Sequence, residues 1–68
     1  SDLIYRVKLK RAEVVYVYIL LEHKSTPEKW VALQLLGYIV SLWQRAKDSG
    51  ASKLPMVIPV VFYHGRRH

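Results

Sequence analysis

Two acidic residues and a lysine, Asp2, Glu22 and Lys24, are the side chains of this sequence whose types and spacing could do chemistry. Two neighbouring carboxylates repel each other and stay ionised cheaply only when a cation lies between them. Mg²⁺ suits such a pair, because it prefers oxygen ligands and is often held by one or two carboxylates and a substrate phosphate. A nearby lysine could orient the attacking water or neutralise charge on phosphorus. We therefore predict a catalytic site for phosphodiester hydrolysis, with Asp2 and Glu22 as metal ligands.

A β-hairpin must bring these residues together. Alternation of apolar and polar residues predicts a strand over residues 2–10, and a run of β-branched and aromatic residues predicts a second strand over 14–24. The second strand is apolar on both faces, as expected for a central strand that is covered above and below. A turn near Ala12 would place Asp2 opposite Glu22, with the lysine two residues further along the same face. The buried face of the first strand would carry Leu3, Tyr5, Val7 and Leu9.

A helix is predicted over residues 27–47. Ser25 could cap it, Glu28 could complete a capping box, and Gly50 suits the left-handed position that follows a helix. The apolar residues recur at steps of three and four, so the stripe that they form should face the sheet. That stripe consists of Ala32, Leu35, Leu36, Ile39, Leu42, Trp43 and Ala46.

A last strand is predicted over residues 56–63. A strand, a helix and another strand form a crossover that places the two strands parallel. Pro59 cannot donate to a strand ladder, so this strand should lie at an edge or carry a bulge. The predicted fold class is α/β, a single domain with a mixed sheet in ββαβ order.

Composition narrows the possible partners. The chain of 68 residues has 51% hydrophobic residues, no cysteine and a formal net charge of +6, which favours a polyanion as partner. The longest apolar run, residues 14–21, has eight residues. This is well short of the roughly 20 that a membrane-spanning helix needs, so no membrane partner is predicted. Four cations on and after the first strand either contact phosphate or form a solvated face: Arg6, Lys8, Lys10 and Arg11.

Spacing alone favours a plainer interpretation, in which Glu22 and Lys24 are solvated at a strand end and Asp2 is a frayed terminal residue. Position favours the site, because the pair interrupts an apolar central strand where ligand sites of α/β sheets form. His23 points to the opposite face from Glu22 and is expected to be packed or hydrogen-bonded. His64 is expected to mark a turn.

Four segments resemble a known family: "SDLIYRVKLK", "VYVYILLEHKSTPEKW", "ALQLLGYIVSLWQ" and "LPMVIPVVFYHG". They are similar to the Rpn or YhgA-like family of bacterial transposase-like proteins, assigned to the PD-(D/E)XK nuclease superfamily. The resemblance covers nearly the whole chain. It implies a restriction-endonuclease-like core that cuts double-stranded DNA with Mg²⁺, in proteins linked to recombination and mobile elements.

The resemblance places the acidic residues of the superfamily at Asp2 and Glu22 and its lysine at Lys24. The family usually has glutamine at the last of these positions, so Lys24 departs from it while matching the wider superfamily. Gln34 and Gly37 stand where basic residues are expected, which puts substrate affinity along the helix in doubt.

The first hypothesis is therefore a Mg²⁺-dependent DNA endonuclease, bacterial and cytoplasmic, with no small-molecule cofactor. The alternative is a non-catalytic module that binds nucleic acid or protein through a vestigial nuclease site. The family core implies further sequence on both sides, so we expect these 68 residues to be an excised fragment that is inactive by itself. An exposed strand edge predicts a homodimer.

Overall fold

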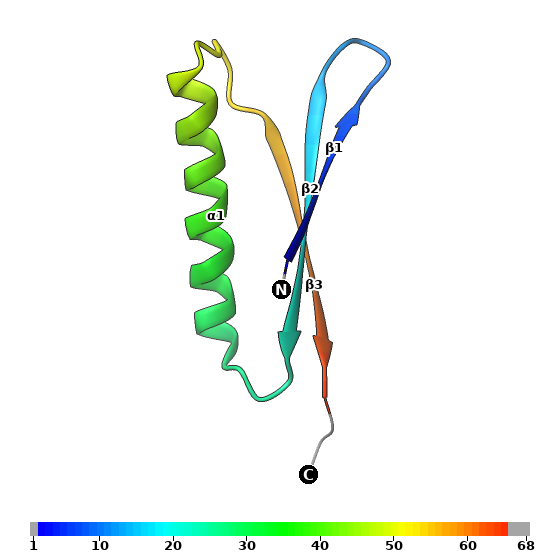
Figure 1. The fold of residues 1–68 in the computed structure, drawn as a ribbon, viewed down its shortest axis with the longest axis vertical. Coiled ribbons are helices and arrows are strands. Elements are labelled where there is room, and N and C mark those ends of the chain that lie inside the picture. The colour runs from blue at the N-terminus through cyan, green and yellow to red at the C-terminus, as the bar shows by residue number, and fades with distance from the viewer. Residues whose placement is uncertain (1, 66–68) are drawn as a thin grey trace.

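The computed structural model describes residues 2–65, which form three strands and one helix (Figure 1). In chain order these are β1 (Asp2–Lys8), β2 (Val14–His23), α1 (Glu28–Asp48) and β3 (Met56–His64). The predicted mixed α/β fold in ββαβ order is confirmed. The first strand is two residues shorter than predicted, and the bounds of the other elements differ from the prediction by one residue at most.

The central strand of the sheet is β2, within the strand order β1-β2-β3. It pairs antiparallel with β1 and parallel with β3, and α1 makes the crossover between the parallel strands. Pro59 lies opposite Tyr18 on β3, which is an edge strand among the described residues. The edge position predicted from this proline is confirmed.

The hairpin register differs from the predicted one by two residues. Asp2 pairs with Leu20, and not with Glu22. The difference arises in the turn, where the N–H of Leu9 donates to the carbonyl of Glu13 at 2.8 Å, so the chain reverses one residue earlier than predicted. Side chains alternate between faces with a period of two, so a shift of two leaves Asp2 on the face that carries Glu22.

The two ends of α1 differ in how well the sequence predicts them. Pro27 occupies the N-cap position and no side chain caps the helix, so the predicted capping box is wrong. Ser25 instead contacts His23, which removes its hydroxyl from the helix end. At the other end Gly50 has φ of 92°, and its N–H donates to the carbonyl of Lys47. The prediction that a glycine in the left-handed conformation follows the helix is therefore confirmed.

The core lies between α1 and one face of the sheet. Tyr18 and Leu20 are buried there against Val31, with further apolar side chains around them: Leu35, Tyr38, Val57 and Val61. The predicted stripe is wrong at two positions, because Ala32 and Leu36 are exposed and Val31 is buried in their place. Leu33, Leu36 and Val40 form a second apolar stripe, so spacing alone did not define which side of the helix faces the sheet.

The opposite face of the sheet is apolar except at one end, where His23 and His64 lie, and no helix of residues 2–65 covers it. Alternation places eleven apolar residues there, three on β1 and four on each of β2 and β3, and then His23 and His64 at the ends of these two strands. They are Leu3, Tyr5, Val7, Val15, Val17, Ile19, Leu21, Met56, Ile58, Val60 and Phe62. The sequence predicted that both faces of the sheet are covered, but within the described residues α1 covers only one of them. Leu3, which was predicted to be buried, is 51% exposed. We refer to these eleven residues as the open face.

Candidate functional site

The structure brings Glu22 and Lys24 to the carboxyl end of β2 and places Asp2 on the same face nearby. Glu22 is half-buried, while Asp2 and Lys24 are exposed. Lys24 lies one residue beyond β2, and its N–H donates to the carbonyl of His64 at 2.8 Å, which fixes its backbone against β3. Within residues 2–65 no three His, Cys, Asp or Glu side chains form a group that could hold a metal. Asp2 and Glu22, the two predicted ligands, lie on one face of the sheet.

Asp2 is held by a buried tyrosine. The hydroxyl of Tyr18 donates to Asp2 Oδ2 at 3.1 Å, and the Tyr18 ring is 1% exposed. Burial raises the pKa of Tyr18 to about 12, and the hydrogen bond to Asp2 and the charge of Asp2 act in the same direction. The side chain of Gln34 on α1 acts in the opposite direction and lowers the pKa of Tyr18. Gln34, which stands where a basic residue was expected, therefore lies beside Tyr18.

Glu22 is held by the turn that connects β2 to α1. Its Oε1 atom accepts a 3.1 Å hydrogen bond from the hydroxyl of Thr26 and another of 3.1 Å from the N–H of His23. Thr26 is itself fixed, because its N–H donates to the carbonyl of His23 at 3.0 Å. The carboxylate of Glu22 therefore has a defined direction before any ligand binds.

A pocket of about 350 Å³ lies beside these groups and is lined by Lys24, Thr26, Glu28 and Tyr63. Tyr63 pairs with Glu22 across β2 and β3, which places the two residues on one face. Lys24 was predicted as a site residue, and the other three lining residues were not. The sequence could have pointed to Tyr63 only through the register of the parallel pair β2 and β3, because that register places Tyr63 opposite Glu22.

The rings of the two histidines near the site pack against each other, and His23 also forms hydrogen bonds. His23 Nδ1 lies 2.7 Å from Ser25 Oγ and accepts a hydrogen bond from the N–H of Ser25 at 3.1 Å. The ring of His64 meets the ring of His23 edge to face at 5.5 Å. The hydrogen-bonded state predicted for His23 is confirmed. The turn expected at His64 is wrong, because β3 extends through His64 to a bend at Gly65.

The four predicted nucleic-acid-binding cations are exposed along the hairpin. Arg6 and Lys8 lie on β1 on the face of Asp2, while Lys10 and Arg11 lie in the turn. The turn and the C-terminal end of α1 share one end of the molecule, and the N-terminal end of α1 lies at the other (Figure 1). The cations thus run from the neighbourhood of Asp2 toward the end remote from Glu22.

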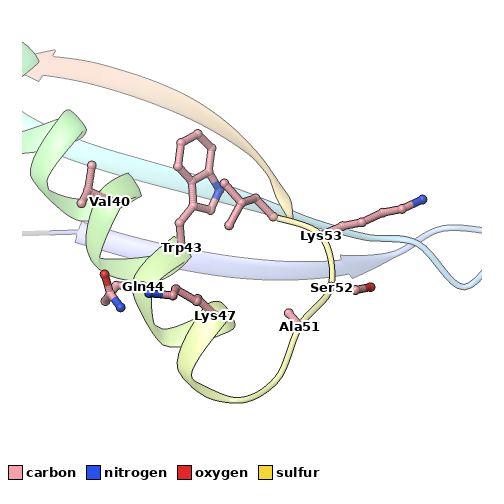
Figure 2. A pocket seen from close by; sticks show the side chains of 8 residues that line it. Val40, Trp43, Gln44, Lys47, Ala51, Ser52 and Lys53 are labelled. Carbon is pink, nitrogen blue, oxygen red and sulfur yellow. The ribbon is translucent and has the colours of Figure 1, made fainter.

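A second pocket, of about 370 Å³, lies at that remote end, between the last turns of α1 and the segment that leads to β3. Figure 2 shows the indole of Trp43 reaching from α1 toward this segment, with Lys47 on the helix and Lys53 on the connecting loop. Trp43 Nε1 donates to the carbonyl of Pro55 at 2.8 Å, which joins the helix to the start of β3. Helix α1 has 21 residues and is about 30 Å long, so this pocket is separate from the candidate site.

The donor chemistry fits a hard divalent cation. Asp2 Oδ1 and Glu22 Oε2 accept no hydrogen bond from the described residues, so each carboxylate has one oxygen available. Mg²⁺ takes oxygen ligands, retains several waters and is commonly bound by one or two carboxylates together with substrate phosphates. No helix within residues 2–65 is both long and apolar enough to span a membrane.

The fold and the site define a class: a mixed α/β segment that gathers carboxylates at the carboxyl end of its central strand. A family model described as "Putative transposase, YhgA-like" matches residues 1–68, and the chain belongs to this family. The resemblance noted from the sequence segments is confirmed.

Three curated relatives show how much of such a protein the chain represents. It is 40% identical over 65 residues to the recombination-promoting nuclease RpnA of Escherichia coli K12, covering 96% of the chain and 22% of RpnA. The inactive recombination-promoting nuclease-like protein RpnE of the same strain is 37% identical, with 96% and 21% covered. RpnD, a recombination-promoting nuclease of Escherichia coli O157:H7, is 35% identical over 68 residues, with 98% and 26% covered. The chain spans about a quarter or less of each relative, and no solved structure matches it.

Proposed function

We propose that this chain carries the metal-binding strands of a Mg²⁺-dependent DNA endonuclease that acts in recombination. The observation that carries the proposal is the placement of Asp2 and Glu22 on one face of the sheet, each with one carboxylate oxygen available. The names of RpnA and RpnD, which are nucleases, support the same function.

Asp2 and Glu22 would hold Mg²⁺, which when bound polarises a phosphodiester and lowers the pKa of a coordinated water. The ammonium of Lys24, beside the pocket, is suited to neutralise the charge that develops on phosphorus or to orient the attacking water. Tyr63 lines the same pocket and offers its hydroxyl to a phosphate oxygen, whereas the hydroxyl of Thr26 already donates to Glu22. The half-buried position of Glu22 strengthens its electrostatic interactions relative to those of an exposed carboxylate.

The experiment is plasmid cleavage with Mg²⁺, Ca²⁺ or EDTA. Because the chain spans 22% of RpnA, we propose that the 68 residues alone do not cleave DNA, and the protein tested is RpnA with its matching segment replaced by residues 1–68. We expect cleavage with Mg²⁺ and none with EDTA. Glu22→Ala should abolish it, while Glu13→Ala, a carboxylate next to the hairpin turn, should cleave normally. Undiminished cleavage by the Glu22 variant would refute the assignment.

A second candidate is a non-catalytic module that binds DNA through a vestigial site. It is favoured by RpnE, which is 37% identical to the chain and is named inactive. Under this alternative, DNA binding would depend on salt, persist in EDTA and give no cleavage products. The Mg²⁺ and EDTA arms of the plasmid experiment separate the two candidates.

We also propose that two copies of the chain associate. Its support is the open face and the two edge strands β1 and β3 within the described residues, since exposed apolar surface and unpaired strand edges both favour association. Light scattering after gel filtration should give the mass of two chains, and Ile58→Lys on the open face should shift it to one. A wild-type chain that elutes with the mass of one copy would contradict this.

A further inference from the structure

Each candidate metal-binding carboxylate is held by one side-chain hydroxyl. The hydroxyl of Tyr18 donates to Asp2 Oδ2 and that of Thr26 donates to Glu22 Oε1, both at 3.1 Å. In both cases a single oxygen of the carboxylate is engaged by a hydroxyl and the other is left available. The two donors lie in different parts of the chain: Tyr18 is in the middle of β2, and Thr26 is in the turn that follows β2.

Tyr18 is suited to hold a neighbour in place because it cannot easily move. Its ring stacks on that of Tyr38 of α1, with centroids 4.0 Å apart and planes 17° from parallel. Because this stacking holds the ring, the hydroxyl that donates to Asp2 Oδ2 has a fixed position. Tyr38 thereby connects the position of Asp2 to the docking of the helix on the sheet.

Thr26 is fixed by its own backbone. Its N–H donates to the carbonyl of His23, and its side chain then reaches back four residues to Glu22. The next residue, Pro27, is the N-cap of α1, so the start of the helix limits how far this turn can shift. Tyr18 is thus held by packing against α1, and Thr26 by the hydrogen bonds of its own turn.

We propose that Tyr18 and Thr26 are positioning residues of the metal site, each fixing one carboxylate so that its second oxygen can take a cation. The inference rests on the proposed function, since it presumes that Asp2 and Glu22 bind the metal. Partners of metal ligands that are themselves not ligands commonly change metal affinity by about 10- to 100-fold when removed. A carboxylate that is already oriented loses less freedom on binding, which is the physical origin of such an effect.

The test is the affinity of the chain for Mn²⁺, which takes the same oxygen ligands as Mg²⁺ and broadens the NMR signals of nearby residues. The variants Tyr18→Phe and Thr26→Val remove one hydroxyl each, and each should weaken Mn²⁺ binding by about 10-fold. Tyr16→Phe and Ser25→Ala remove hydroxyls from neighbouring positions and should bind as the wild type does. Thr26→Ser restores the hydroxyl and should restore the affinity.

Unfolding measured in EDTA shows whether a variant is merely destabilised, and Thr26 provides an independent arm because it lies in a turn outside the core. Wild-type affinity in both Tyr18→Phe and Thr26→Val would overturn the inference while leaving the site intact. Asp2→Asn and Glu22→Gln distinguish a failure of the positioning inference from a failure of the metal site itself. If these variants also bind Mn²⁺ normally, or the wild type binds none, then the metal site itself is refuted together with the inference.

Discussion

The N–H of Ala12 donates to the carbonyl of Leu9 at 3.1 Å, and Ala12 has φ of 62°. An alanine in the left-handed region costs roughly 1–2 kcal/mol, because its Cβ approaches the following carbonyl. Ala12→Gly should relieve this strain and raise the free energy of unfolding by roughly 0.5–1 kcal/mol, after the extra flexibility of glycine in the unfolded chain is counted. Urea denaturation followed by circular dichroism measures the change.

Ala32→Gly is the matched control, because Ala32 is exposed within α1. The same substitution there should lower the free energy of unfolding by about 1 kcal/mol, as expected for glycine inside a helix. Equal losses in the two variants would show that the turn is not strained at Ala12.

A second prediction compares two glycines. A Cβ at Gly65 would lie 2.6 Å from His23 Nε2, and Gly65 has φ of 115°, so Gly65→Ala should destabilise the chain by at least about 1 kcal/mol. A Cβ at Gly37, inside α1, would meet no atom of the described residues beyond its own helix backbone within 4 Å, so Gly37→Ala should stabilise by about 1 kcal/mol. Thermal unfolding should therefore move in opposite directions for the two variants.

A third prediction concerns alkaline pH. The pKa of Tyr18 is raised from 10.0 to about 12, so above pH 10 the folded chain keeps a proton that the unfolded chain loses. This contribution to stability is complete below pH 10 and is lost as the pH rises toward about 12, at up to about 1.4 kcal/mol per pH unit. Urea denaturation across this range should show a steeper loss for the wild type than for Tyr18→Phe. Tyr16→Phe should retain the wild-type slope.

A fourth prediction concerns the hairpin cations. If Arg6, Lys8, Lys10 and Arg11 contact phosphates, each alanine substitution should weaken DNA binding and lower the slope of log K against log salt by about 0.9. Fluorescence anisotropy in EDTA isolates binding from cleavage. Lys47→Ala removes an equal charge from the last turn of α1, at the same end of the molecule as the hairpin turn but on the helix, and should leave the slope unchanged. An unchanged slope in all four hairpin variants would assign these cations to a solvated face.

The element order was predictable because period-two and helical spacing are local signals, and Gly50 and Pro59 each report a specific backbone requirement. The register was not, because the turn uses Ala12 where a glycine would have revealed the left-handed position. The buried side of α1 was mistaken because the helix has apolar residues on more than one side, as Leu36, 60% exposed, shows. Only the docking of the helix on the sheet decides between the two stripes.

The candidate site, like the fold, was predictable from the sequence only in part. The shared face of Asp2 and Glu22 followed from strand alternation, and it tolerated an error of two residues in register. The roles of Tyr18 and Thr26 were not predictable, because a hydroxyl direction depends on neighbours that are distant in sequence, such as Tyr38 against Tyr18. Ser25 was predicted as a cap and lies one residue before the hydroxyl that reaches Glu22.

The two neighbours of β2 also differ in the order in which they can form. The antiparallel partner β1 is joined by a short turn, and hairpins of this kind form in roughly 1–10 μs. The parallel partner β3 follows a 21-residue helix, so its pairing must close a long loop first. We therefore expect the contact between Asp2 and Tyr18 to form early in folding and the pairing of Glu22 with Tyr63 late, so that the candidate site is completed in two kinetic stages.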